Sequence, residues 1–375
     1  MICPVIFKPE TNIHQDFRAK NLLVSNGIAL EASAENEAFK PDFMEVSVVD
    51  SLNIQVLRGF GLKPKSVRKE KSYFVCSTDK GLKTIRRTNL SHENILFQHE
   101  LKERLFSGGF AETDRFGLSV HCLPYFDFED EVYTITDNFP LREAVFSNGD
   151  DFRLLVRAVS KMHSVGKYFS FEAHLPSKTD FDLVYRKNSA ALRSVKKRVL
   201  RQSALSDFDV VFLKDFDFML SQLDEWHCFV MAHGVSALVG CGGFAHNNLK
   251  EENLLFDGQR VYITDFSSVS PGSHVRDLAD IIKRYQKKAD CLNIDILSVI
   301  KLYGEVNALT RNDLLLLYSL LKYPERYLRL CFQYYEKKRT WTPAAFTTRL
   351  QALSSTKHDF NAYIERLRPF VLKEG

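Results

Sequence analysis

Apolar and polar residues alternate at short range in an early part of the chain, where they predict an antiparallel sheet. The run that follows Lys71 and the run Leu82–Arg87 flank Thr78–Gly81, which has the composition of a turn, so the three segments predict a hairpin. Val120–Leu123 and Val132–Thr136 are rich in β-forming residues and predict two further strands. These segments together predict one small sheet.

One helix is predicted between the two pairs of strands. Ser91 is a favourable cap for its first turn, although Asn94 makes the capping box partial because Glu or Gln normally completes it. Gly108-Gly109 ends the segment. Apolar residues recur every four positions and predict its buried stripe: Phe97, Leu101 and Leu105.

Helical spacing dominates the rest of the chain. It predicts helices over 152–169, 208–231, 290–303, 311–322, 327–337, 346–353 and 359–372, and a basic helical segment over 188–202. A small antiparallel sheet with one helix, followed by a large and mainly helical part, predicts an α+β protein of two lobes. We expect a loosely packed extension over residues 1–45, an N-terminal lobe over 46–138 and a helical C-terminal lobe over 139–375.

A short hairpin, over residues 244–266, interrupts the helical part. Asn253–Phe256 and Val261–Thr264 are β-rich, and the Asp-Gly pair between them signals a two-residue reverse turn. His246 and Asn248 precede the first strand, and Asp265 follows the second. Because a hairpin of this length brings its outer ends together, we expect these polar side chains to converge.

The spacing of these residues matches the catalytic loop of phosphotransferases, H-x-D-x-x-x-x-N, followed by a metal-binding Asp. His246 and Asn248 are the candidate catalytic residues, and Asn253 and Asp265 are the candidate metal ligands. Asn248 stands where the loop requires Asp, and an amide cannot accept the proton of a substrate hydroxyl. The general base is therefore missing. Asp277 strengthens the match, because kinase-like proteins bury an Asp there against the loop.

The phosphate-binding part of a kinase N-terminal lobe is also altered. No glycine-rich loop lies between the first strands, and on spacing Arg86 occupies the place of the phosphate-pairing Lys, whereas Lys83 falls short of it. Arg is a rigid fork rather than a compact point charge, and a surface strand position explains Arg86 equally well. Asp137, Asn138 and Phe139 form the linker whose backbone would meet an adenine in a kinase-like fold.

Composition excludes several other classes of protein. The 375 residues carry a net charge of +4, from 51 basic and 47 acidic side chains, which is too small to indicate nucleic-acid binding. The seven Cys residues are scattered and form no C-x-x-C pair, as is typical of reduced thiols inside a cell. No apolar run approaches the ~20 residues that span a membrane, and the N-terminus lacks the pattern of a secretory signal.

These motifs resemble those of the CotS-type spore-coat proteins, a branch of the aminoglycoside phosphotransferase and choline kinase-like superfamily. The resemblance runs from about Leu57 to the C-terminus and departs from the family at Arg86, Asn248 and Ser267, the last replacing a frequent acidic residue. It implies a bilobal protein kinase-like fold, ATP and Mg²⁺ as cofactors and other spore-coat proteins as partners. It also implies a location in the cytoplasm of the sporulating cell, followed by deposition in the coat. The segments that carry it are Gly81–Arg87, Leu105–Phe110, Val132–Thr136, Lys161–His163, His246–Phe256, Ile263–Phe266, Arg276–Ala279 and Pro324–Trp341.

Three functions are compatible with these observations. The altered loop and clamp favour a degenerate kinase that acts as a binding or scaffold component of the spore coat, with weak, Mg²⁺-assisted binding of ATP. The alternative is an active small-molecule phosphotransferase, because Asn253 and Asp265 could hold Mg²⁺ and phosphoryl transfer depends mainly on positioning. A third is a structural coat component that never meets nucleotide and binds proteins through its extension or the basic segment Arg193–Arg201.

Overall fold

A computed structural model describes residues 52–70, 72–167, 180–239, 243–288, 294–336 and 341–373. All of these residues belong to one compact unit, Ser47–Gly375. The predicted extension over residues 1–45 lies outside the described residues. Among the described helices, none combines the length and apolar character needed to cross a membrane.

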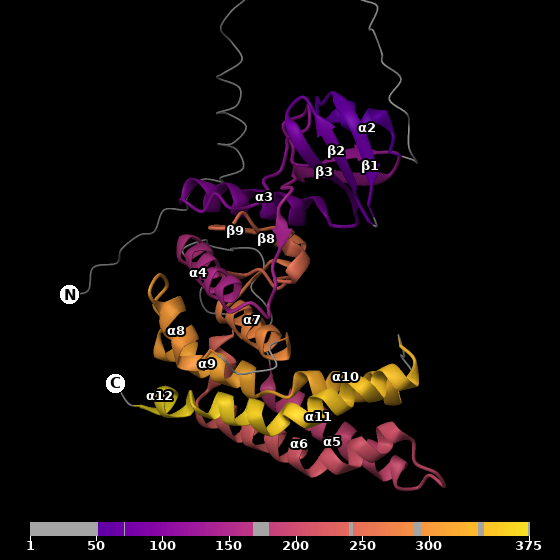
Figure 1. The fold of residues 1–375 in the computed structure, drawn as a ribbon, viewed down its shortest axis with the longest axis vertical. Helices are drawn as coiled ribbons and strands as arrows, with labels where there is room; N and C mark the ends of the chain where they lie inside the picture. The colour runs from indigo at the N-terminus through magenta and orange to yellow at the C-terminus, as the bar shows by residue number, and fades with distance from the viewer. Residues whose placement is uncertain are drawn as a thin grey trace, which may run out of the picture. The chain divides into compact units, whose positions relative to one another are not determined.

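A five-stranded sheet forms the N-terminal lobe, with the strand order β1-β2-β3-β5-β4 (Figure 1). Its antiparallel strands are β1 (Pro64–Lys69), β2 (Phe74–Thr78), β3 (Gly81–Thr88), β4 (Phe126–Phe128) and β5 (Glu131–Asp137). The predicted hairpin is confirmed, since β2 pairs with β3 from Phe74 opposite Ile85 to Thr78 opposite Gly81. Gly81 has a φ of +93°, a value that residues with a side chain rarely adopt, so this turn requires glycine.

The prediction of a strand over Val120–Leu123 is wrong. These residues reverse the chain, because the amide of Ser119 donates to the carbonyl of Leu123 at 2.7 Å and that of Cys122 donates to Ser119 at 2.9 Å. Val120 is 59% exposed, so its apolar side chain has no buried face of a sheet to join. The edge strand is β4, a few residues further along the chain.

Two helices accompany the sheet, the short α2 (Ile54–Gly59), which was not predicted, and α3 (His92–Ser107). The hydroxyl of Ser91 accepts the amide of Asn94 at 3.3 Å, which confirms the predicted cap of α3. Leu101 and Leu105 of α3 are fully buried, but they join the core of the helical lobe and not the separate core between α2 and the sheet. By its packing, α3 therefore belongs with the C-terminal lobe.

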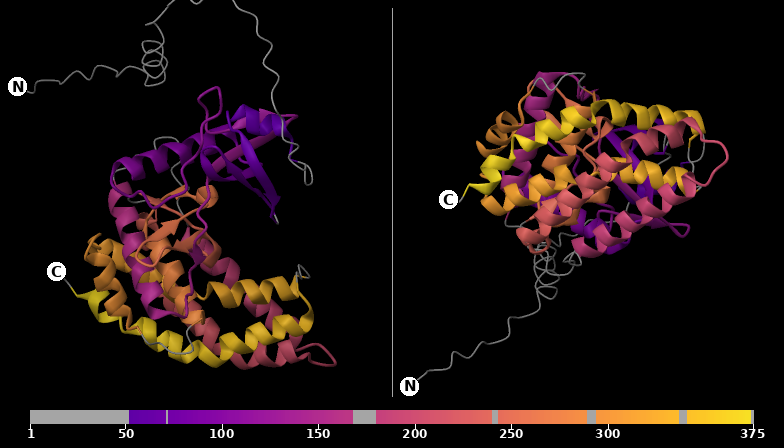
Figure 2. Two further views of the ribbon diagram at one scale, coloured as in Figure 1. Left: turned by 45° about the horizontal axis from the view of Figure 1, so that its top comes forward. Right: turned by 90° about the horizontal axis from the view of Figure 1, so that it is seen from below.

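The C-terminal lobe is mainly helical, which confirms the predicted bilobal α+β, protein kinase-like fold. Helices α5, α6, α10 and α11 pack together as a layer on the side away from the sheet, while α4, α7 and α8 lie between (Figures 1 and 2). Helix α11 runs without a break from the predicted segment 346–353 into the last one, 359–372, the end of which forms the separate helix α12. The helices are α4 (Gly149–Gly166), α5 (Phe181–Val199), α6 (Asp207–Ala232), α7 (Val275–Lys288), α8 (Ile296–Gly304), α9 (Arg311–Lys322), α10 (Glu325–Tyr335), α11 (Pro343–Glu365) and α12 (Arg368–Leu372).

Two small sheets hold the segment that carries the candidate site. Strands β6 (Arg142–Glu143), β8 (Leu254–Phe256) and β9 (Val261–Ile263) form one, and β7 (Phe244–Ala245) with β10 (Ser270–Pro271) forms the other. The predicted hairpin is confirmed as β8 and β9, but its turn is wider than two residues, because Phe256 pairs with Val261. The candidate loop thus lies between β7 and β8, and Asp265 follows β9.

Candidate active site

The loop after β7 is fixed by one buried carboxylate from α7. Asp277 is 1% exposed and accepts the backbone amides of His246 at 2.6 Å and Asn247 at 2.8 Å. Its Oδ2 also accepts a hydrogen bond from Nε2 of His163 at 2.9 Å, and Nδ1 of His163 lies 2.8 Å from the Tyr303 hydroxyl. The predicted role of Asp277 against the loop is confirmed.

Asp277 stays ionised although it lies inside the protein. Burial by itself opposes ionisation, but the hydrogen bonds from the His163 ring and from the backbone amide of His246 outweigh burial and lower the pKa of Asp277. His163 of α4 is therefore part of the support beneath the loop.

His246 is packed inside the loop. Its side chain is fully buried, its ring meets that of Phe266 edge-on with centroids 4.5 Å apart, and its Nδ1 accepts the amide of Asn248 at 3.2 Å. Burial lowers the pKa of His246 despite the nearby carboxylates, so the ring is neutral at pH 7. A neutral ring that accepts at Nδ1 carries its hydrogen on Nε2. This arrangement shapes the loop.

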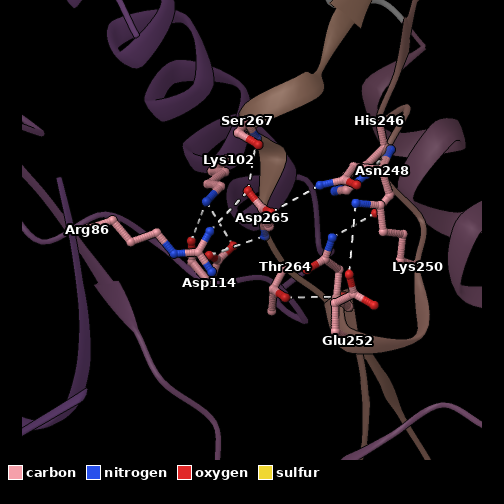
Figure 3. A network of polar contacts seen from close by, with 11 residues as sticks. Arg86, Lys102, Asp114, His246, Asn248, Lys250, Glu252, Thr264, Asp265 and Ser267 are labelled. Atoms are coloured by element: carbon pink, nitrogen blue, oxygen red, sulfur yellow. Dashed lines mark hydrogen bonds and ion pairs between the residues drawn. The ribbon is translucent and has the colours of Figure 1, made fainter. Parts of the chain in front are cut away.

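Asn248 lies against Asp265, as Figure 3 shows, and Asn253 lies against Asn248 in turn. Nδ2 of Asn248 donates to Oδ2 of Asp265 at 3.0 Å, and Nδ2 of Asn253 donates to the carbonyl of Asn248 at 2.9 Å. The amide of Asn248 thus faces a carboxylate as a donor. An aspartate there would bring two carboxylates into contact, and an amide has no basic oxygen to accept a proton from a hydroxyl.

Both oxygens of Asp265 have partners within the protein. Oδ1 lies 3.3 Å from Nη1 of Arg86 and accepts the amide of Ser267 at 3.4 Å, while Oδ2 accepts Asn248. Burial opposes ionisation, but Arg86 and the hydrogen bonds from Ser267 lower the pKa of Asp265. Asp265 has a φ of 60°, which turns the chain sharply after β9.

Arg86 of β3 extends toward Asp265, with its side chain 40% exposed (Figure 3). Its guanidinium lies between Asp265 and the ring of Tyr73, whose centroid is 5.1 Å away. The neighbouring Arg87 pairs instead with Glu131 at 3.0 Å, and Lys83 pairs with Asp137 at 2.5 Å. The geometry therefore distinguishes the two cations: Arg86 reaches the candidate metal ligand and Lys83 does not.

A second buried ion pair lies behind this cluster and was missed from the sequence. Lys102 of α3 and Asp114 lie 2.8 Å apart, with side chains 1% and 9% exposed, and Asp114 also accepts the amide of Asp265 at 3.4 Å (Figure 3). The carboxylates of α3 do not reach this cluster, since Glu100 and Glu103 pair with arginines outside it. The sequence does contain one indication of this burial: Lys102 lies three residues before the buried Leu105 and therefore on the same face of α3.

The linker after β5 has its first amides engaged. The backbone amide of Asp137 donates to the carbonyl of Arg115 at 3.1 Å, and that of Asn138 donates to the carbonyl of Leu82 at 3.1 Å. The ring of Phe139 packs on the ring of Tyr262, with centroids 4.6 Å apart. An adenine here would meet carbonyl oxygens of Asp137 and Asn138, or the backbone from Phe139 onward. Contact between this linker and nucleotide stays a prediction.

A pocket of about 470 Å³ lies beneath the sheet next to this linker. Its apolar part is formed by Tyr73 in the turn before β2, Val75 of β2, Leu82 of β3 and Phe139. Its charged part is the ion pair of Arg68 with Glu70. Its volume is in the range of small-molecule sites, about 300–1,000 Å³.

The donors near Asp265 suit magnesium only in part. Carboxylate and amide oxygens are ligands that Mg²⁺ accepts, and Mg²⁺ commonly takes one or two carboxylates beside substrate phosphates. Asp265 and Asn253 offer such a set, but Arg86 already neutralises Asp265. Among the described residues no cluster of three or more His, Cys, Asp or Glu could hold a metal ion. A magnesium ion therefore fits here only when Arg86 has moved away from the carboxylate of Asp265.

Comparison with known families decides the relationship of the chain. The family described as "Spore coat putative kinase YutH" matches residues 54–367. The chain belongs to this family. The predicted resemblance to CotS-type, kinase-like spore-coat proteins is thereby confirmed. No curated protein sequence matches the chain.

Solved structures agree on the fold. An aminoglycoside phosphotransferase from Alicyclobacillus acidocaldarius is similar with a TM-score of 0.77 at 17% identity, over 87% of this chain and 98% of that one. The AMP-bound spectinomycin phosphotransferase APH(9)-Ia is similar with a TM-score of 0.52 at 13% identity, over 84% and 93%. The amicoumacin kinase hAmiN, in complex with AMP-PNP and Ca²⁺, has a TM-score of 0.52 at 16% identity, over 79% and 89%. At these identities the likeness establishes the shared fold.

Proposed function

We propose that this kinase-like spore-coat protein is a degenerate kinase, which binds nucleotide weakly and serves the coat as a binding or scaffold component. The observation that carries the proposal is the arrangement around Asp265, where Asn248 donates to one oxygen and Arg86 pairs with the other. The residue expected to accept a proton is a donor, and the expected metal ligand is already neutralised.

Each change weakens a different part of phosphoryl transfer. Loss of a general base typically costs ~10²–10⁴ in rate. Arg86 adds a second obstacle, because its ion pair with Asp265 must open before a metal can use that carboxylate. Both changes leave the loop and its anchor Asp277 in place, so the fold does not depend on the chemistry.

Nucleotide binding is proposed on the pocket beneath the sheet and the linker beside it. Asp137, Asn138 and Phe139 border that pocket or lead into it, and Arg86 offers a fixed cation to a phosphate group. Asp265 and Asn253 would hold Mg²⁺ once Arg86 has moved. When bound, the ion would neutralise phosphate charge. The expected result is weak binding of ATP with a small effect of Mg²⁺.

The place of action is proposed from the family. Its members' description as spore-coat proteins supports deposition in the coat after synthesis in the sporulating cell, with other coat proteins as partners. The exposed basic side chains of α5, among them Arg193, Lys197 and Arg198, offer one surface for an acidic partner.

An active small-molecule phosphotransferase is the second candidate. Asn253 and Asp265 keep the spacing of the metal-binding pair, and phosphoryl transfer relies on positioning and electrostatics more than on a strong base. In that case Asn248→Asp raises the turnover of ATP with the correct acceptor. If the protein is active and this change has no effect, the role given to position 248 is wrong.

Thermal melting with ATP tests the proposal directly. A ligand at 100 times its dissociation constant stabilises a protein by ~2.7 kcal/mol, which is visible as a higher Tm. We expect a Tm increase with millimolar ATP that changes little when Mg²⁺ is added. In Arg86→Gln, which releases Asp265, the Mg²⁺-dependent part grows, and in Arg86→Gln/Asp265→Asn it is lost again.

Two results would contradict the proposal. ATP hydrolysis or transfer above a mock preparation, abolished by Asp265→Asn, would make the protein an active kinase. Absence of any Tm shift with ATP, in the wild type and in Arg86→Gln, would leave a structural coat component that does not bind nucleotide.

A further inference from the structure

A second pocket, of about 450 Å³, lies on the helical side of the same loop. Asn247 of the loop borders it, and its walls come mainly from α7 and α10. It shares no lining residue with the pocket beneath the sheet. Asn248 and Arg86, the two altered positions of the kinase site, do not line this pocket, so it is a separate feature of the fold.

The pocket is rich in cations. Helix α7 contributes Arg276, Lys283 and Arg284, and α10 contributes Arg329. Arg326 follows Glu325 on α10; burial lowers its pKa, and the nearby charges of Arg284 and Arg329 lower it further. Five cations therefore share this region.

The carboxylates of the pocket do not balance these cations. Asp280 pairs with Arg284 at 2.7 Å, while Glu325 is shared by Arg329 at 3.4 Å and Lys283 at 3.8 Å. The third carboxylate, Asp277, already accepts hydrogen bonds from the loop amides and His163. Among the described residues, Arg276 and Arg326 have no carboxylate within ion-pairing distance.

Two of the cations are also poorly solvated. The side chain of Lys283 is only 13% exposed, and burial lowers its pKa, with Glu325 opposing that change. Arg326 is half-buried, and burial likewise lowers its pKa. A buried charge is costly unless an opposite charge and hydrogen bonds compensate for it. An anion in this pocket would supply that compensation.

We propose that the pocket between α7 and α10 binds a small ligand through a phosphoryl group that carries two negative charges. Arginine forks match the oxygens of phosphate in bidentate geometry, and a lysine adds a point charge. The volume admits a small phosphorylated molecule as well as the free ion. The same surplus of positive charge disfavours a polyamine-like ligand. This binding does not depend on nucleotide binding beneath the sheet.

Calorimetric titration with pyrophosphate and with inorganic phosphate tests the proposal, in EDTA and at an ionic strength held constant with chloride. Both probes should bind the wild-type protein, pyrophosphate more tightly because it carries more charge. Arg329→Gln and Lys283→Met should each weaken pyrophosphate binding about tenfold or more, the size expected for one charge-assisted hydrogen bond. Binding of a sugar phosphate as tightly as pyrophosphate would identify a phosphorylated molecule as the ligand. Binding of only the two inorganic probes would identify the free ion.

Two control variants distinguish this pocket from the exposed basic surface and from the pocket beneath the sheet. Lys197→Gln removes an equivalent charge from the exposed face of α5 and should leave binding unchanged. Arg86→Gln removes the cation beside Asp265 and should also leave pyrophosphate binding at the wild-type level. Failure of ATP binding therefore leaves this proposal standing, and the reverse also holds.

The fold of the test variants can be checked separately. Arg329 has a side chain 60% exposed, so its replacement should leave the Tm in chloride near the wild-type value, and this variant decides the result if Lys283→Met does not fold. The proposal is overturned if millimolar pyrophosphate does not bind the wild type. It is also overturned if Lys197→Gln weakens binding as much as the pocket variants do, or if only Arg86→Gln weakens it.

Discussion

Asp277 and Asp265 are two aspartates beside the same loop, and they are held in opposite ways. Asp277 is 1% exposed and is stabilised by two backbone amides and a histidine. Asp265 has a side chain 18% exposed and is stabilised by the Arg86 guanidinium and the Asn248 amide. The first aspartate supports the shape of the loop, and the second is where the chemistry would occur.

The difference teaches that the architecture of a phosphotransferase site does not require its chemistry. Asp277 holds two backbone amides of the loop, and the loop keeps its form with Asn at position 248. At Asp265 a side-chain cation stands where the template requires a metal. The two regions therefore respond differently to substitution, and four predictions separate them.

The largest effect is expected at the support of the loop. Asp277→Ala leaves the amides of His246 and Asn247 and the ring of His163 without their acceptor, which should lower the free energy of unfolding by on the order of 5 kcal/mol. Urea unfolding measures this loss. Asp277→Asn keeps one acceptor oxygen and should lose less. A loss below about 1 kcal/mol in Asp277→Ala would show that the anchor is not structural.

The second largest loss of stability is expected at the buried ion pair of Lys102 with Asp114. Lys102→Met leaves Asp114 charged and buried without its partner, at a cost of about 3 kcal/mol or more. Lys102→Met/Asp114→Asn should recover part of that loss, because the uncompensated charge is removed. Lys161→Met is the matched control: Lys161 is 46% exposed and pairs loosely with Glu112 at 3.5 Å, so its loss should stay within about 1 kcal/mol. Equal losses of unfolding free energy in Lys102→Met and Lys161→Met would contradict the conclusion that the Lys102–Asp114 pair is a buried, stabilising ion pair.

A smaller, pH-dependent effect is expected at the loop itself. Asn248→Asp brings a second carboxylate to Asp265 and raises the pKa of one of them, costing about 1–2 kcal/mol at pH 8. The cost is present above the raised pKa and disappears as the pH falls below the unfolded value of ~4. Urea unfolding at about pH 8 and about pH 3 should therefore show a difference from wild type only at the higher pH. The same difference at both values would mean that the two side chains do not face each other.

The smallest effect is expected at Arg86. Its side chain is 40% exposed, so Arg86→Gln should cost below about 1 kcal/mol at pH 7. Because Arg86 helps to lower the pKa of Asp265, the pair contributes stability above the unfolded pKa and loses it as the pH falls through the folded one. The difference between wild type and Arg86→Gln should thus vanish in acid, as unfolding at pH 7 and pH 3 would measure. A difference that persists in acid would show that Arg86 acts by packing on Tyr73.

Local patterns were sufficient to predict the hairpin, the loop and the buried position of Asp277. Each depends on residues that are close in the sequence, or on a motif with fixed spacing. The pairing of Lys102 with Asp114 could not be predicted in this way, because a lysine in a helix normally reaches solvent, whereas Lys102 lies against Asp114 and the rings of Phe116 and Phe266. Val120–Leu123 misled the prediction because β-rich composition does not reveal that a segment lacks a partner strand.

The segment that follows α3 has a mechanical consequence for the two lobes. The amide of Ile263 in β9 donates to Glu112 at 3.0 Å, and that of Asp137 at the end of β5 donates to Arg115 at 3.1 Å. One short stretch therefore ties the sheet and the catalytic hairpin together, while α3 packs with the helical core. A movement that carried β3 away from β9 would also separate Arg86 from Asp265. Release of that ion pair and opening of the lobes would then be a single event.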